Sequence, residues 1–269
     1  MKKRIHSNRY FAIVLSLLLA ATGITAQEID TTFTPHSGQE GKDVVWVPTP
    51  QALVDTMLSL AKVTAADYVM DLGSGDGRLV ITAAKRGATA LGIEYNPNMV
   101  ALARRNAAQE GVSERAKFEN ADIFETDFSK ATVITLFLLT DLNLRLRPKI
   151  LDMKPGTRIV SNTFGMSDWE PDQVMHSDNE PSWNTANLWI VPAKVGGTWK
   201  IDGGQINFLQ EFQNITGTLT TGGDSKEIKG KLNGDKISFN AGGTEYTGTV
   251  SGNTISGTRA GGGSWNATR

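Results

Sequence analysis

Two spacings of apolar residues alternate between residues 44 and 194. Short apolar runs of strand length are separated by segments in which apolar residues recur every three or four positions, as on one face of a helix. The predicted strands are 68–73, 89–95, 116–121, 132–139 and 157–164, and the predicted helices are 51–62, 77–86, 97–110 and 142–151. This alternation is typical of an α/β fold, a Rossmann-like parallel sheet with helices on both faces. Residues 172–178 and 185–194 are expected to close the sheet as an antiparallel pair.

The composition changes near Val195, and Gly, Thr, Ser and Asn predominate from there to residue 269. Short strands recur between glycine-containing turns, and the pattern of residues 230–238 returns at residues 248–256. Such a repeat indicates duplicated hairpins. We expect a second, small all-β domain, a meander that closes into a barrel or a sandwich. Its expected details are a two-residue turn at Asn233-Gly234, and Trp199 packed on Trp265.

The first 26 residues have the pattern of a secretory signal peptide. A basic start at residues 2–4 precedes an apolar stretch over residues 11–21, and small residues follow up to residue 26. The apolar stretch is shorter than the about 20 residues that a membrane helix needs. These features predict a periplasmic or secreted protein without a stable membrane span after cleavage. Residues 27–43 are polar and are expected to form a flexible leader, which places the first folded domain at 44–194 and the β domain at 195–269.

Charge and residue types narrow the possible functions. Lys and Arg number 27 against 28 Asp and Glu, for a net charge of −1, so no broad positive field would attract nucleic acid. The absence of cysteine excludes disulfides and a thiol nucleophile. The three histidines form no pattern typical of a metal site.

The chemistry is concentrated in the sequence Val-Met-Asp-Leu-Gly-Ser-Gly-Asp-Gly-Arg at residues 69–78. A buried strand would end at Asp71, and a glycine loop would lead into a helix. Arg78 stands where a dinucleotide-binding loop would place its third glycine, which argues against an NAD enzyme. The Asp71 carboxylate would repel a pyrophosphate but suit a ligand with an ammonium and a sulfonium, namely S-adenosylmethionine. The residues expected to hold it in the loop are Gly73, Ser74, Gly75 and Gly77.

Acidic residues also end the next two predicted strands. Glu94 would accept hydrogen bonds from both ribose hydroxyls of the cofactor. Asp122 would accept from the adenine amino group, while Ile123 packs on the ring. Each acid taken alone is also compatible with a turn or a strand-end cap.

The stretch from about residue 47 to residue 172 resembles the class I methyltransferases. It is similar to the small lysine methyltransferases that modify the ATP synthase c subunit and the adenine nucleotide translocase. The motifs that carry the resemblance are VPTP at 47–50, DLGSGDGR at 71–78, GIEYN at 92–96 and DWEP at 168–171. The resemblance implies an S-adenosylmethionine-dependent enzyme that methylates a protein lysine. The alternative is an exported binding protein with a catalytically silent methyltransferase-like domain and a ligand-binding β domain.

Four residues are candidates for the substrate side of the site. Thr140 and Asp141 follow the fourth predicted strand, where substrate meets the methyl group in this fold, and would either orient an amine or cap a helix. Phe164 and Trp169 would either line a channel for a lysine side chain, whose ammonium is attracted to aromatic faces, or pack in the core.

Overall fold

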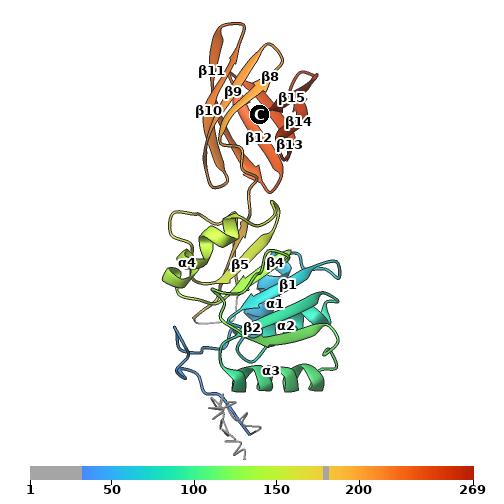
Figure 1. The fold of residues 1–269 in the computed structure, drawn as a ribbon, viewed down its shortest axis with the longest axis vertical. Coiled ribbons are helices and arrows are strands. Elements are labelled where there is room, and N and C mark those ends of the chain that lie inside the picture. Colours follow the sequence, from blue (N-terminus) through green and yellow to red (C-terminus); the bar gives the residue numbers. More distant parts are fainter. Residues whose placement is uncertain (1–31, 178–181) are drawn as a thin grey trace, which may run out of the picture.

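The structure is a computed structural model that describes residues 32–177 and 182–269. It contains an α/β domain and a β-barrel that follows it along the chain (Figure 1). The predicted fold class, a Rossmann-like sheet with a second small β domain, is confirmed. The predicted signal peptide and the first part of the predicted leader lie outside the described residues. In the described ranges no helix is long and apolar enough to cross a membrane.

The α/β domain is built on a seven-stranded sheet with the order β3-β2-β1-β4-β5-β7-β6. Its elements are α1 (Gln51–Leu60), β1 (Tyr68–Leu72), α2 (Arg78–Lys85), β2 (Thr89–Glu94), α3 (Pro97–Gln109), β3 (Ala116–Asn120), β4 (Val133–Leu136), α4 (Thr140–Leu151), β5 (Arg158–Asn162), β6 (Gln173–His176) and β7 (Thr185–Ile190). Strands β1 to β5 are parallel, and β7 and β6 are antiparallel at the edge, as the sequence predicts.

Buried residues on both faces of the sheet hold the helices in place. One cluster joins α1, α2 and α3 to the sheet, and a second joins α4 to the opposite face. Helix α3 begins where the Asn96 side chain accepts the backbone N–H groups of Asn98 and Met99, with Pro97 in the first turn. Such a cap satisfies donors that have no partner within the helix. Local side-chain chemistry therefore determines where α3 begins.

The second domain is a closed barrel of eight strands. The strands are β8 (Gly197–Ile201), β9 (Gly204–Glu211), β10 (Asn214–Thr221), β11 (Asp224–Asn233), β12 (Lys236–Ala241), β13 (Thr244–Ser251), β14 (Thr254–Arg259) and β15 (Ser264–Thr268). Neighbours in sequence pair as antiparallel hairpins, and β15 pairs with β8 to close the barrel. Alternate residues point inward and form a packed hydrophobic core, so the interior is filled by side chains.

Two details of the barrel differ from the predictions. The turn between β11 and β12 is Gly234-Asp235, because Asn233 still pairs with Lys236 across the hairpin. Gly234 adopts a φ of 59°, so the glycine occupies the first turn position. Trp199 and Trp265 share the core but contact different groups. The Trp199 Nε1 donates to a backbone carbonyl next to the domain junction, whereas Trp265 packs edge-on against two other aromatic rings.

The loop between β9 and β10 of the barrel packs against the α/β domain. It consists of Phe212 and Gln213, and Phe212 has a φ of 52°, which is uncommon for a bulky side chain. Phe212 stacks on Trp169 with 5.6 Å between ring centroids. The buried Gln213 side chain accepts from Trp169 Nε1 and donates to the Glu170 carbonyl, both at 2.9 Å. Contacts of this kind fix the position of the barrel relative to the sheet.

Candidate active site

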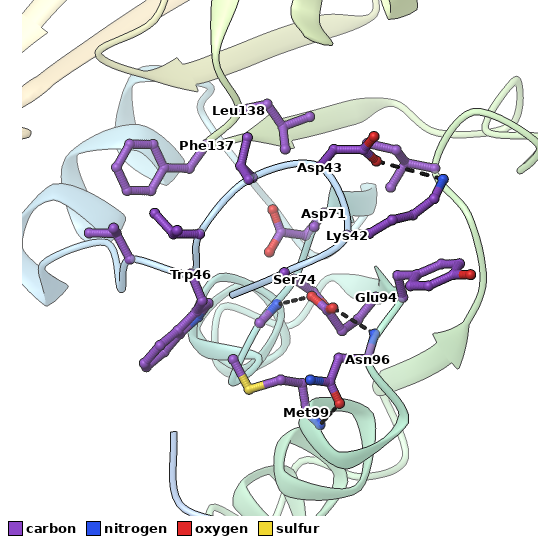
Figure 2. Close-up of a pocket in the computed structure, with 18 of the residues that line it drawn as sticks. Lys42, Asp43, Trp46, Asp71, Ser74, Glu94, Asn96, Met99, Phe137 and Leu138 are labelled. Atoms are coloured by element: carbon purple, nitrogen blue, oxygen red, sulfur yellow. Dashed lines mark hydrogen bonds and ion pairs between the residues drawn. The ribbon is translucent and has the colours of Figure 1, made fainter. Parts of the chain in front are cut away.

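A pocket opens at the carboxyl ends of β1, β2 and β4, where the strand order changes direction next to β1 (Figure 2). Ligands of open α/β sheets bind at this position, because helix and loop amides converge there. The glycine loop, the strand-end acids and the segment of residues 39–49 form the wall of the pocket. We call residues 39–49 the strap. The predicted cofactor residues that line the pocket are Asp71, Gly73, Ser74, Gly75, Glu94, Asp122 and Ile123.

Asp71 lies at the base of the pocket and is only 3% exposed. Its Oδ1 accepts a hydrogen bond of 2.5 Å from the hydroxyl of Thr135 on the neighbouring strand. Burial raises the pKa of Asp71 to about 7, the Thr135 hydrogen bond opposes this rise, and the nearby Glu94 and Asp76 carboxylates add to it. A carboxylate held in these surroundings would be stabilised by a cationic group. Asp71 therefore fits the ammonium of an amino-acid ligand.

The glycine loop brings the backbone close to other parts of the chain. Gly75 has a φ of 51°, and a Cβ atom there would lie 2.4 Å from the indole nitrogen of Trp46 in the strap. Gly77 does not line the pocket, although its φ of 85° suits glycine. A Cβ at Gly77 would meet the Phe118 ring at 2.7 Å, so this glycine serves the packing of α2 against the sheet. The loop residues thus divide between ligand contact and packing.

Ser74 supplies a further polar group to the pocket. Its hydroxyl is buried and has no hydrogen-bond partner among the residues that the structure describes. A buried hydroxyl without a partner carries a desolvation cost that a polar ligand atom would remove. The loop therefore fits a ligand with hydrogen-bonding groups.

Glu94 is held in place by two backbone groups. One carboxylate oxygen accepts the N–H of Gly75 and the other accepts the N–H of Asn96, each at 2.9 Å, as the dashed lines of Figure 2 show. Each oxygen keeps a further lone pair, so the carboxylate can also accept from two hydroxyls of one ligand. This geometry suits a ribose.

The strap crosses the pocket and is tied down by the ion pair between Lys42 and Asp122. The Lys42 ammonium donates to Asp122 at 2.5 Å and lies 5.0 Å from the centre of the Tyr95 ring. The hydrogen bond from Lys42 lowers the pKa of Asp122, and the same bond raises the pKa of Lys42. The flexible leader predicted for residues 27–43 is therefore wrong for residues 39–43, which pack on the pocket. No local pattern in the sequence indicates this contact, since the two partners are 80 positions apart.

The four substrate-side candidates have different environments. Thr140 and Asp141 are the first residues of α4 and do not line the pocket. Neither residue caps the helix, as the alternative prediction would require, because Leu139 occupies the N-cap position. Phe164 stacks against Phe137, which does line the pocket.

The substrate-channel prediction for Trp169 is wrong. Trp169 is fully buried, its ring stacks on Phe212 of the barrel, and its Nε1 bonds to Gln213. Packing is the role that remains for it.

Phe137 and Trp183 are aromatic residues that the sequence-based predictions missed. Both rings pack against Phe164. An apolar strand end at Phe137 is typical of core, and Trp183 lies in a loop without any recognisable motif.

Among the described residues, no group of His, Cys, Asp and Glu could hold a metal ion.

Known proteins resemble the part of the chain that builds this pocket. The family model of the ANTKMT methyltransferase domain matches residues 71–173. A protein-lysine N-methyltransferase of Saccharolobus islandicus (strain REY15A) is 42% identical over 151 residues, which are 55% of this chain and 94% of that protein. The human lysine N-methyltransferase named for the ATP synthase c subunit is 32% identical over 139 residues, and the match spans 51% of this chain and 59% of the human protein.

A solved structure agrees with the cofactor that the pocket suits. An RNA methyltransferase from Salinibacter ruber, crystallised with S-adenosyl-L-homocysteine, is 44% identical and superposes with a TM-score of 0.52. The match spans 55% of this chain and 96% of the Salinibacter protein. The pocket with Asp71 and Glu94 at its strand ends, the family model and these relatives lead to one conclusion. The chain belongs to the ANTKMT methyltransferase family and is an S-adenosylmethionine-dependent methyltransferase.

Proposed function

We propose that this protein transfers a methyl group from S-adenosylmethionine to the side-chain nitrogen of lysine in a protein substrate. The observation that carries the proposal is the 42% identity to an archaeal protein-lysine N-methyltransferase over 94% of that protein. The pocket supports it, because a buried carboxylate, a fixed carboxylate and an unpartnered hydroxyl meet at the carboxyl edge of the sheet within the described part of the chain.

The residues of the pocket have separate tasks in this proposal. Asp71 would bind the ammonium of the cofactor, Glu94 the ribose hydroxyls and Asp122 the adenine amino group. Asp122 already accepts from Lys42 through one oxygen, and its other oxygen accepts the backbone N–H of Phe124. When bound, S-adenosylmethionine supplies a methyl group activated by its sulfonium. The protein's main contribution is then to align the acceptor nitrogen with that group.

Protein is favoured over nucleic acid as the substrate. The Salinibacter protein is named for RNA, whereas the archaeal and human relatives described above, which match over longer stretches than an rRNA methyltransferase of Acidithiobacillus ferrooxidans does, are named for lysine. This chain has a net charge of −1, so it lacks the excess of basic residues that a phosphate backbone attracts. A basic, lysine-bearing protein is compatible with that balance.

A methyl-transfer assay tests the proposal. The full chain is incubated with tritium-labelled S-adenosylmethionine and either a mixture of proteins or total RNA, and Gly75→Val serves as the inactive control. We expect label in protein, at lysine by mass spectrometry of the digested product. Label in RNA alone, or equal label with the control variant, would contradict the proposal.

We also propose that the protein is exported. The support is the basic and then apolar pattern of residues 1–26. Cell fractionation and N-terminal sequencing of the purified protein test this, and an uncleaved cytoplasmic chain would refute it. Export would raise the question of how the cofactor, which is made in the cytoplasm, reaches the enzyme.

A further inference from the structure

Three aromatic rings meet at the carboxyl edge of the sheet. Phe137 follows β4, Phe164 follows β5 and Trp183 precedes β7. The distances between ring centroids are 6.1 Å for the two phenylalanines, 5.6 Å from Phe137 to Trp183 and 5.5 Å from Phe164 to Trp183. The three rings thus form a nearly equilateral triangle. We call this group the aromatic triangle.

The aromatic triangle adjoins the cofactor pocket and is open to solvent. Phe137 belongs both to the triangle and to the lining of the pocket, where Figure 2 labels it next to Leu138. Trp183 is 38% exposed, which is high for a large aromatic residue that packs on two others. Phe137 therefore links the pocket to a ring, Trp183, that solvent reaches.

The backbone that carries two of the rings is strained. Trp183 itself has a φ of 56°, and Thr163, which precedes Phe164, has a φ of 57°. Both conformations are unfavourable for bulky or β-branched residues. Hydrogen bonds hold the backbone at Thr163 in this conformation. The Thr163 N–H donates to the Thr185 carbonyl at 2.7 Å, and the Asn187 side-chain amide donates to the Thr163 carbonyl. Strain that the surrounding structure maintains is concentrated at functional sites.

We propose that the aromatic triangle is the acceptor subsite, a cage that binds the ammonium of a methylated lysine through cation–π attraction. The inference rests on the proposed lysine methyltransferase function and names the state of the lysine that the site prefers. A cation about 3 Å above the plane of the three centroids would lie about 4.5 Å from each, within the about 6 Å over which cation–π attraction acts.

Methylation of the lysine strengthens its fit to such a cage. Each methyl group replaces an N–H that would otherwise need a hydrogen-bond acceptor, and the three rings offer none. A methylated ammonium is also larger and less strongly hydrated, so its transfer from water to an aromatic surface costs less. The cage would therefore retain a lysine that already carries methyl groups.

Peptide binding tests the cage without any turnover. The probes are blocked Gly-Lys-Gly peptides whose lysine is unmodified, trimethylated, or replaced by the neutral isostere with carbon in place of the quaternary nitrogen. Binding to the full chain is measured by NMR titration, without nucleoside. We expect the trimethylated peptide to bind about five- to thirtyfold more tightly than the neutral isostere, which corresponds to ~1–2 kcal/mol of cation–π attraction.

Variants locate the effect. Trp183→Ala should remove the preference for the cation, and Trp183→Phe should keep part of it. Leu209→Ala serves as the matched control, because Leu209 is an exposed apolar residue of the barrel and should leave the preference unchanged. Equal or tighter binding of the isostere, absence of binding, or a preference that survives Trp183→Ala would each overturn the cage.

A separate titration with S-adenosylhomocysteine, together with the methyl-transfer assay described above, distinguishes the two proposals. If the wild-type chain binds the nucleoside and methylates lysine but shows no preference for the trimethylated peptide, only the cage fails. If lysine is never methylated while the trimethylated peptide still binds at Trp183, the proposed function fails instead.

Discussion

Substitution of Asp71 tests the site directly. Burial of its carboxylate favours the binding of a cationic ligand, and the same burial destabilises the folded protein when no ligand is bound. The folded protein raises the pKa of this carboxyl from its ordinary 3.8 to about 7. Between these values the folded state keeps a proton that the unfolded state has released. The contribution of Asp71 to stability therefore falls as the pH rises from about 4 to about 7, and the full cost is present above pH 7.

The size of this cost follows from the shift in pKa. At about 1.4 kcal/mol per pH unit, the carboxylate destabilises the free protein at pH 8 by up to ~4 kcal/mol. Asn has nearly the same shape, carries no charge and still offers an oxygen to the Thr135 hydroxyl. We expect Asp71→Asn to unfold with nearly the wild-type free energy at pH 4 and to be more stable than wild type at pH 8.

Ligand binding should change in the opposite direction. Loss of the carboxylate removes a charge-assisted hydrogen bond, which should weaken the binding of S-adenosylhomocysteine by about 1.5–3 kcal/mol. Urea unfolding at a series of pH values and calorimetric titration at pH 8 measure the two effects. Asp202→Asn, in an exposed turn of the barrel, is the control and should alter neither.

Each half of this prediction can fail separately. If the difference in unfolding free energy between Asp71→Asn and wild type were the same at pH 4 and pH 8, burial would not raise the pKa of the Asp71 carboxyl. Unchanged affinity for S-adenosylhomocysteine would mean that Asp71 does not bind the ammonium of the ligand.

Three further substitutions test other contacts. Glu94→Ala should weaken S-adenosylhomocysteine binding by about 1.5–3 kcal/mol, and unchanged affinity in calorimetry would remove this carboxylate from the site. Gly75→Val should abolish that binding, because its Cβ would lie 2.4 Å from Trp46 Nε1, while the circular dichroism of the barrel persists; retained binding would place the ligand elsewhere. Gln213→Ala should cost about 1–3 kcal/mol in urea unfolding by leaving the buried Trp169 Nε1 without an acceptor, and a loss below about 0.5 kcal/mol would argue against this contact as a link between the domains.

The sequence alone was sufficient for features that depend on short stretches of chain. The alternation of strands and helices from residue 51 to residue 190 follows from local spacing, and the observed elements begin and end within a few residues of the predicted ones. The loop at residues 73–77 could be recognised because glycine adopts the positive φ angles of positions 73, 75 and 77 at little steric cost. Parallel strands bring their carboxyl ends to one edge, so the meeting of Asp71 and Glu94 could also be predicted.

Only the tertiary structure decided which distant residues meet there. Residues 39–43 of the strap pack on the pocket through Lys42 and Asp122, although their polar composition predicts a flexible leader. Trp169 lies in a motif beside the predicted site, yet the barrel buries it. Phe137 and Trp183 join Phe164 across three separate segments. Local spacing carries no information about these contacts, because burial and aromatic packing depend on how separate elements come together in space.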